Sequence, residues 1–175
     1  MSTYEHAVWA KEQLGQDWNE YYKVAFVRNP LDRLVSWYTM IQERGKPPWY
    51  KRFTGIGKYR RMRQYVFENS NTFGDFLYNC VDIIEDTDGR KSFAYNQLDY
   101  ITDEDGSIFV DFIGKFENLN NDTQTVFQNL GLENAALPHK NSSNHKNYRS
   151  YYTEVTRELV AEQFARDIDF FGYEF

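Results

Sequence analysis

The spacing of apolar residues along the first quarter of the chain predicts a helix, a short strand and a second helix. Residues 4–15 have a helical pattern that ends at a glycine, and residues 23–28 form an apolar run that is typical of a buried strand. Asn29 and Pro30 follow at once, a pair that suits the cap and the first position of a helix. Apolar residues then recur at helical spacing over residues 30–44. This stretch is therefore predicted to run from a strand through a tight turn into a helix.

The rest of the chain continues the alternation of helices and apolar runs. We expect a loop over 45–58, a basic helix over 59–68, an amphipathic helix over 73–84 capped by Asn71 or Thr72, an acidic turn over 85–92, a strand from Ile108 to Ile113, a helix from Leu119 closed by Gly131, a polar loop over 138–150 and a last helix from Thr153 through Ile168. This order indicates an α/β fold in which a small parallel sheet is flanked by helices. Two strands make a thin sheet, and a complete α/β domain usually has more.

Length and composition narrow the class of protein. The 175 residues suit one domain, and the 41% share of apolar types excludes an intrinsically disordered chain. No apolar run approaches the ~18 residues of a membrane span, and no signal peptide follows the first methionine. The one cysteine, Cys80, excludes an internal disulfide and a cysteine-based metal cluster. We therefore expect a single domain over residues 1–175, without metal or membrane span and located in the cytoplasm.

Basic residues are concentrated in one part of an otherwise acidic chain. The net charge is −6, yet eight Lys and Arg and no acid lie between Glu43 and Glu68, which leaves 12 bases against 26 acids elsewhere. This distribution indicates a local anion site more than a general affinity for nucleic acid. A solvated surface is the plainer interpretation of such a run. Residues 44–70 are interpreted as a basic excursion from the domain.

The predicted turn between the first strand and the following helix is a candidate phosphate site. Amide groups at a helix start attract anions, because they lack partners within the helix and the helix dipole is positive there. Arg28 stands at the end of the strand, and Arg33 and Ser36 lie on the helix that follows. Their guanidinium and hydroxyl groups would hold a phosphate by charge-assisted hydrogen bonds. The alternative is that both arginines pair with Asp32 or with other acids.

The segment from Phe26 to Tyr38, FVRNPLDRLVSWY, resembles the 3′-phosphate-binding segment of sulfotransferases, most closely that of the Golgi-type carbohydrate sulfotransferases and their bacterial relatives. The signature Arg-x-Pro-x-x-Arg-x-x-Ser-x-Tyr follows an apolar strand there, and every fixed position is present here. Similar segments follow at 97–101 (QLDYI), 111–119 (DFIGKFENL) and 167–175 (DIDFFGYEF). The resemblance therefore runs through nearly the whole chain in order.

This resemblance implies a P-loop-like sulfotransferase fold and the donor 3′-phosphoadenosine-5′-phosphosulfate (PAPS), whose sulfuryl group the family passes to a hydroxyl or an amine. By the same resemblance, Arg28 and Ser36 would bind the 3′-phosphate, and Arg33 would assist or hold the turn through Asp32. Family members open with a strand and a loop, often Lys-Thr-x-x-Thr-Ser, that cradles the 5′-phosphosulfate. We expect this N-terminal strand and loop to be missing from the chain, and no Gly-x4-Gly-Lys-Ser/Thr pattern replaces them.

His6 is the candidate general base. Transfer to an alcohol needs a base that takes the hydroxyl proton, and histidine titrates near neutral pH. The position of His6, shortly before the strand that ends at Arg28, resembles that of the catalytic histidine in uronyl 2-O-sulfotransferases, whereas other branches use a glutamate. The alternative is a surface histidine on a frayed terminal helix.

Two further groups of basic residues are candidate binding residues. Lys140 and Lys146 lie in the polar loop before the last helix, which by the resemblance closes over the nucleotide; a plain polar connection is the alternative. Lys51, Arg52, Arg60 and Arg61 alternate with aromatic residues, a pattern that suits an anionic glycan and also single-stranded nucleic acid. We favour a carbohydrate or another small polar acceptor and expect no nucleic acid. The leading hypothesis is a PAPS-dependent sulfotransferase; the alternative is a catalytically incomplete module of the same fold that binds nucleotide or glycan.

Overall fold

The computed structural model of the chain describes residues 6–46, 58–81, 92–103, 105–132, 135–137 and 146–175. Its helices and strands, joined in places by short 3₁₀ turns, are α1 (His6–Leu14), β1 (Val24–Val27), α2 (Pro30–Arg44), α3 (Lys58–Asn69), α4 (Phe73–Cys80), β2 (Phe112–Lys115), α5 (Leu119–Asn129), α6 (Glu154–Gln163) and α7 (Ala165–Phe171). The order confirms the predicted α/β class, with a small parallel sheet flanked by helices.

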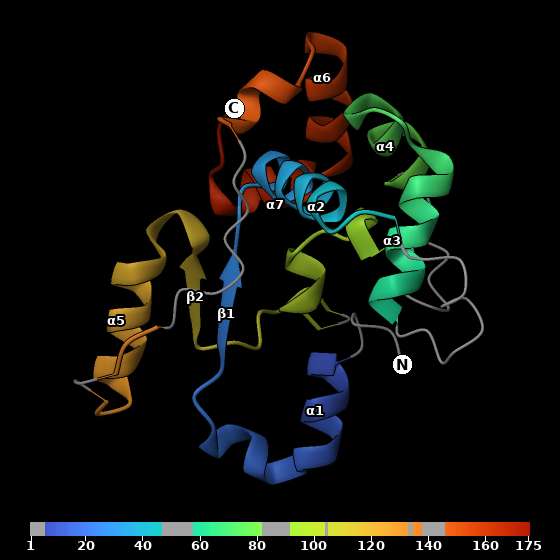
Figure 1. The fold of residues 1–175 in the computed structure, drawn as a ribbon. Helices are drawn as coiled ribbons and strands as arrows, with labels where there is room; N and C mark the ends of the chain where they lie inside the picture. Colours follow the sequence, from blue (N-terminus) through green and yellow to red (C-terminus); the bar gives the residue numbers. More distant parts are fainter. Residues whose placement is uncertain (1–5, 47–57, 82–91, 104, 133–134, 138–145) are drawn as a thin grey trace.

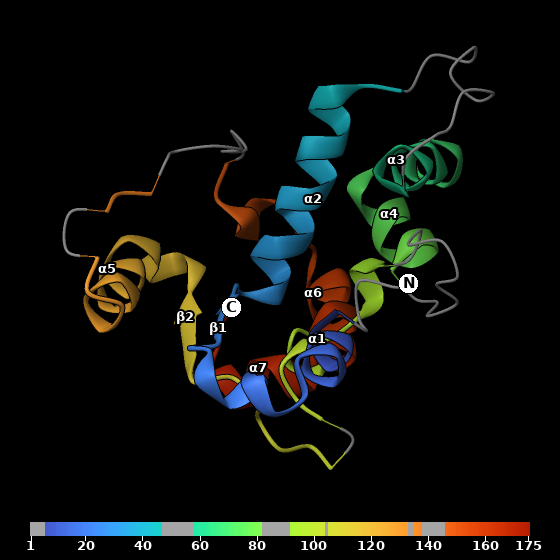
Figure 2. The same cartoon turned by 90° about the horizontal axis from the view of Figure 1, so that it is seen from below.

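The two strands lie side by side and run in the same direction, with Val24 opposite Phe112 and Val27 opposite Lys115 (Figure 1). Both views place α5 beside β2, whereas α3 and α4 lie at the far side of the molecule beyond α2 (Figure 2). Gly114 is opposite Phe26, and a Cβ on this glycine would lie 2.4 Å from the phenylalanine ring. Glycine is therefore required at this position as long as the ring keeps its place.

The main hydrophobic core lies between α2, α3, α4 and α6. Its buried members include Leu34, Val35, Ile41, Met62, Val66, Phe76, Leu77, Cys80, Phe93, Val160 and Phe164. A smaller cluster joins the end of β1 to the C-terminal segment, through Val27, Leu98, Ile101, Phe171 and Tyr173. The end of β1 is thus fixed between two cores, because α2 belongs to the first cluster and Val27 to the second.

Several sequence predictions of secondary structure are confirmed. The first strand, the helix that begins at Pro30 and the basic helix lie within one or two residues of their predicted limits. Thr72 caps α4, and Gly131 follows α5 with a φ of 69°. Residues 47–57 of the predicted loop and most of the predicted acidic turn lie outside the described residues. The helix predicted over 73–84 is shorter than expected, because α4 ends at Cys80 and Val81 is its C-terminal cap. None of the helices in the described ranges is long and apolar enough to cross a membrane.

The second strand begins four residues later than predicted, at Phe112. Asp103 accepts hydrogen bonds from the amides of Asp105 and Ser107, which closes a local turn, and Ile108 then pairs antiparallel with Thr102. The apolar residues from position 108 onward are therefore first used in a local pairing. Only where the amides of Asp111 and Phe112 donate to the carbonyl of Lys23 does the chain join β1.

The predicted last helix is interrupted at Phe164, which divides it into α6 and α7. Phe164 has φ −109° and ψ 25°, outside the helical range, and its side chain is fully buried in the main core. The change of direction lets Val160 face this core while Asp167, in the next helix, reaches the amides of residues 97 and 98. Tertiary contacts thus interrupt a helix whose sequence contains no glycine or proline at this point.

Candidate functional site

Two backbone amides at the start of α2 are bound within the turn between β1 and α2. The Asn29 side chain accepts a hydrogen bond from the Leu31 amide at 3.0 Å, and the Asn29 carbonyl accepts one from the Arg33 amide at 2.8 Å. Pro30, at the first helical position, has no amide hydrogen. The expectation that the amides of this helix start are open to an anion is therefore wrong for Leu31, whose amide the Asn29 side chain binds, while the Arg33 amide makes the first regular bond of the helix.

The Arg28 side chain lies along the first turn of α2 and is held on two sides. Its Nε and Nη2 atoms both lie 2.7 Å from Oδ2 of Asp32, and its guanidinium lies 4.3 Å from the centre of the Phe116 ring. The two charged side chains are only 17% and 15% exposed. The pairing of Arg28 with Asp32 that the sequence left as an alternative is thus present, and it fixes a cation at the carboxyl end of β1.

Ser36 is half-buried on α2, four residues after Asp32. Residues four apart lie on the same face of a helix, so Ser36 is on the face to which Arg28 is bound. The fold thus brings Arg28, Asp32 and Ser36 to one side of α2.

Arg33 turns away from this face. Its Nη2 atom donates to the carbonyls of Phe93, at 3.2 Å, and Tyr95, at 2.7 Å, and its guanidinium lies over the Phe164 ring. Desolvation lowers the pKa of Arg33 below its ordinary value, while the Asp167 carboxylate acts in the opposite direction. Arg33 therefore ties α2 to the segment that precedes residue 97.

The turn is held by three polar residues that the sequence analysis did not identify as part of the site. They are Gln97, Glu117 and Asp167. The Arg28 amide donates to Gln97, and the Asn29 amide donates to Oε1 of Glu117 at 2.6 Å. Asp167 in turn binds the Gln97 backbone. All three lie in segments that resemble the sulfotransferases. Polar residues beside apolar runs in those segments were the available signal, but their spacing does not show what they bind.

Tyrosines surround the same turn. The Tyr152 hydroxyl donates to the Leu31 carbonyl at 2.8 Å, and the Tyr173 hydroxyl lies 3.5 Å from Oε2 of Glu117. Desolvation raises the pKa of both phenols above the ordinary value, and nearby carboxylates add to this effect. Both side chains therefore stay protonated around neutral pH and act as hydrogen-bond donors.

The other predicted site residues are only partly visible. His6 is the first residue of α1, and Arg60 and Arg61 lie on α3, but the placement of these three side chains is outside what the structure describes. Lys51, Arg52 and Lys140 also lie outside the described residues, and Lys146 is exposed shortly before the 3₁₀ turn at 148–151. Within the described part of the chain, no three His, Cys, Asp or Glu side chains are placed to hold a metal ion.

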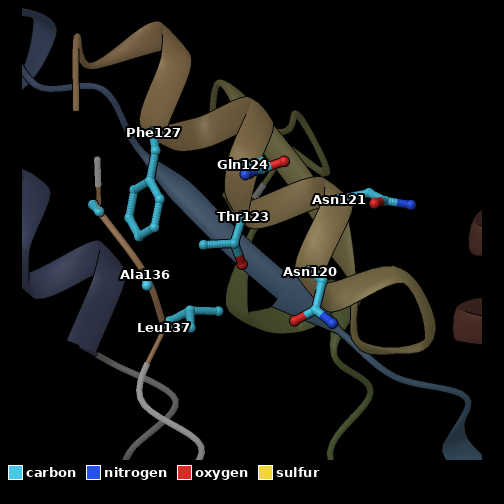
Figure 3. Close-up of a pocket in the computed structure, with 8 residues that line it drawn as sticks. Asn120, Asn121, Thr123, Gln124, Phe127, Ala136 and Leu137 are labelled. Carbon is cyan, nitrogen blue, oxygen red and sulfur yellow. The ribbon is translucent and has the colours of Figure 1, made fainter. Parts of the chain in front are cut away.

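A separate hollow of about 290 Å³ lies beside α5 (Figure 3). It is lined by the side chains of Asn120, Asn121, Thr123, Gln124 and Phe127 and by residues 135–137. None of these side chains carries charge or titrates near neutral pH. Its described lining therefore offers no group for proton transfer or for binding a phosphate by charge, in contrast to the Arg28 turn.

The comparison with protein families agrees with the motif around Arg28. The model of the sulfotransferase family matches residues 4–174, and so includes both strands and every helix from α1 to α7. No curated protein and no solved structure shows a significant match to the chain. Because the family match covers almost the whole sequence, including the turn that carries Arg28, Asp32 and Ser36, the chain belongs to the sulfotransferase family.

Proposed function

We propose that this protein binds PAPS and transfers its sulfuryl group to a hydroxyl of a carbohydrate or of another small polar acceptor. Membership of the sulfotransferase family supports sulfuryl transfer in general, and members of that family generally use PAPS as the donor. The observation that carries the proposal is the Arg28 guanidinium, which is fixed at the end of β1 between Asp32 and Phe116.

In this proposal Arg28 and Ser36 bind the 3′-phosphate of the nucleotide. A guanidinium has five N–H donors in a fixed plane and suits an anion with several oxygens. The start of α2 adds a positive dipole, although its capped amides contribute no direct bonds at Leu31 and Arg33. Arg33 supports the site through the carbonyls that it binds, and Lys140 and Lys146, which precede α6 in the sequence, are proposed to contact the phosphate.

The proposed chemistry is an in-line displacement at sulfur. The acceptor oxygen forms a bond to sulfur while the bond between sulfur and the bridging phosphate oxygen breaks, which yields a sulfate ester and adenosine 3′,5′-bisphosphate. His6 takes the proton of the acceptor hydroxyl, as a general base placed within hydrogen-bond reach. Lys51, Arg52, Arg60 and Arg61 are proposed to bind an anionic acceptor.

Calorimetry with adenosine 3′,5′-bisphosphate and adenosine 5′-monophosphate tests the nucleotide site. We expect the bisphosphate to bind more tightly, and Arg28→Ala to weaken it at least tenfold, because a hydrogen bond to a charged group is worth about 1.5–3 kcal/mol. Affinity for the monophosphate should change little. Lys23→Ala is the matched control, since Lys23 is also paired with a carboxylate, Asp111, but at the opposite end of β1. Equal affinity for the two nucleotides, or an unchanged bisphosphate affinity in Arg28→Ala, would overturn the proposal.

A further inference from the structure

The Arg28 backbone is bound by a side chain where a neighbouring strand would otherwise bind it. The Arg28 amide donates to Oε1 of Gln97 at 2.9 Å, and the Arg28 carbonyl accepts from Nε2 of the same side chain at 2.7 Å. This pair of bonds has the pattern of one closely spaced pair in an antiparallel ladder, in which both polar groups of one residue face the same partner. Gln97 thus binds β1 as a neighbouring strand would, one residue past Val27, the last residue that pairs with β2.

Gln97 is itself fixed by a buried carboxylate. Oδ2 of Asp167 accepts a hydrogen bond from the backbone amide of Gln97 at 2.7 Å and another from its side-chain Nε2 at 3.1 Å. Oδ1 of Asp167 accepts one from the backbone amide of Leu98 at 2.9 Å. Asp167 has no exposed surface. A carboxylate only accepts hydrogen bonds, so Asp167 fixes the orientation of the Gln97 side chain. The side-chain nitrogen faces Asp167 and the Arg28 carbonyl, and the side-chain oxygen faces the Arg28 backbone amide.

The next residue is held from the opposite segment, since the Asn29 amide donates to Glu117. Two successive peptide groups after β1 are therefore bound by side chains about 70 and 90 residues away. Rotation of the chain at this point would move the Arg28 guanidinium from its place against Asp32 and Phe116.

We infer that Gln97, oriented by Asp167, is a positioning residue that sets the Arg28 guanidinium for the 3′-phosphate. The inference rests on the proposed function for the identity of the ligand, whereas the hydrogen bonds among Arg28, Gln97 and Asp167 do not depend on a ligand. Gln97 touches the backbone of Arg28 and not its guanidinium. Replacing Gln97 should therefore weaken recognition of the 3′-phosphate only by displacing Arg28, because Gln97 itself makes no contact with the phosphate in this proposal.

The first measurement needs no nucleotide. Hydrogen exchange by NMR should show the Arg28 amide protected in the wild type and exchanging at least tenfold faster in Gln97→Leu, a variant of similar size that makes neither bond. The Val27 amide, inside β1, should keep its protection. A protected Arg28 amide in Gln97→Leu would overturn the inference and leave the proposed function untouched.

The second measurement compares affinities for adenosine 3′,5′-bisphosphate and adenosine 5′-monophosphate. Gln97→Leu should reduce the preference for the bisphosphate about tenfold, as Arg28→Ala does. The preference of the double variant for the bisphosphate should equal that of Arg28→Ala alone within about twofold, because both changes remove the same contact. Additive losses, or an unchanged preference in Gln97→Leu, would overturn the inference. Absence of any preference in the wild type would overturn the proposed function, and the inference with it.

Two variants separate positioning from stability. Gln163→Leu is the matched control, since the Gln163 side chain also donates to a distant backbone carbonyl, that of Val81, but lies away from the turn. It should lower the free energy of unfolding and leave the nucleotide preference unchanged. Should Gln97→Leu fail to fold, Gln97→Glu replaces it: the carboxylate still accepts from the Arg28 amide but repels the Arg28 carbonyl and Asp167. It should reduce the preference at pH 7, and an unchanged preference would contradict the inference.

Discussion

Helices α2 and α4 both begin with a polar cap, but the two caps take their partners from very different distances along the chain. Thr72 and Asp75 bind one another across the first turn of α4, side chain to amide in both directions, and the motif is exposed. Asn29 is 5% exposed, and its side chain also donates to the carbonyl of Glu174, 145 residues away. The cap of α4 starts a helix, whereas the cap of α2 also fixes where that helix lies relative to the rest of the site.

The largest expected effect is that of Asp167→Ala, which removes the anchor behind the α2 turn. It leaves the amides of Gln97 and Leu98 without their acceptor in a buried place, beside the partly buried charge of Arg33. Each buried donor left without its acceptor costs about 1–3 kcal/mol, and Asp167 serves two backbone amides, so we expect the free energy of unfolding to fall by about 3–5 kcal/mol. Urea unfolding measures the loss. Asp167→Asn keeps the volume and one acceptor and should lose less, and equal losses in the two variants would contradict the role of the carboxylate.

Asn29→Ala should have the second largest effect, about 2 kcal/mol, at the upper end of the range for helix caps. The substitution removes the acceptor for the Leu31 amide and the donor to the Glu174 carbonyl at 3.0 Å. Asn29→Asp separates these two contributions, because it keeps the acceptor and loses the donor. Thermal and urea unfolding of both variants should rank Asp between Asn and Ala. A loss below that of a purely local cap would show that the long-range bond adds nothing.

Thr72→Ala should cost about 1 kcal/mol, the ordinary value of an exposed cap. Its effect should stay local, so that nucleotide affinity remains that of the wild type while Asn29→Ala weakens both stability and binding. Thr72→Ser retains the hydroxyl and serves as the control for the side-chain bond to the Asp75 amide. Weaker nucleotide binding in Thr72→Ala would remove the distinction between the two helix starts.

The smallest effect concerns the pH dependence of the α4 cap. Hydrogen bonds from the Asn71 amide, the Thr72 side chain and the Thr72 amide lower the pKa of Asp75. The stability that this carboxylate contributes is therefore complete above its ordinary pKa of about 3.9 and is lost as the pH falls through the lower value of the folded state. Urea unfolding between pH 6 and 3 should show a shallower decline for Asp75→Asn than for the wild type. Parallel curves would contradict this contribution.

The same contrast explains how much the sequence could predict. The α4 cap, the strand before Arg28 and the start of α2 are local patterns, and each was readable from residues a few positions apart. The break at Phe164 and the late start of β2 were not, because packing of a buried ring and a turn around Asp103 decide them. Local propensity is overridden where tertiary contacts compete with it.

The candidate site divides in the same way. Arg28 and Ser36 follow from a motif within eleven residues, whereas the residues that bind the backbone amides of Arg28 and Asn29 lie about 70 and 90 positions further along. A glutamine at the edge of an apolar run has many possible partners, and only the fold selects one. The pairing of Arg28 with Asp32 was readable as an alternative, because the two residues are four positions apart across the turn between β1 and α2.

The single cysteine of the chain provides an internal reporter of opening motions. Cys80, the last residue of α4, has no exposed surface and packs in the core with residues of α2 and α3. A thiol reagent attacks only an accessible thiolate, so alkylation of this side chain requires the contact between α4 and that core to open. The labelling rate in native buffer therefore measures how often these helices separate, without the introduction of another cysteine. Bound nucleotide would slow labelling only if it also holds α2 against the core.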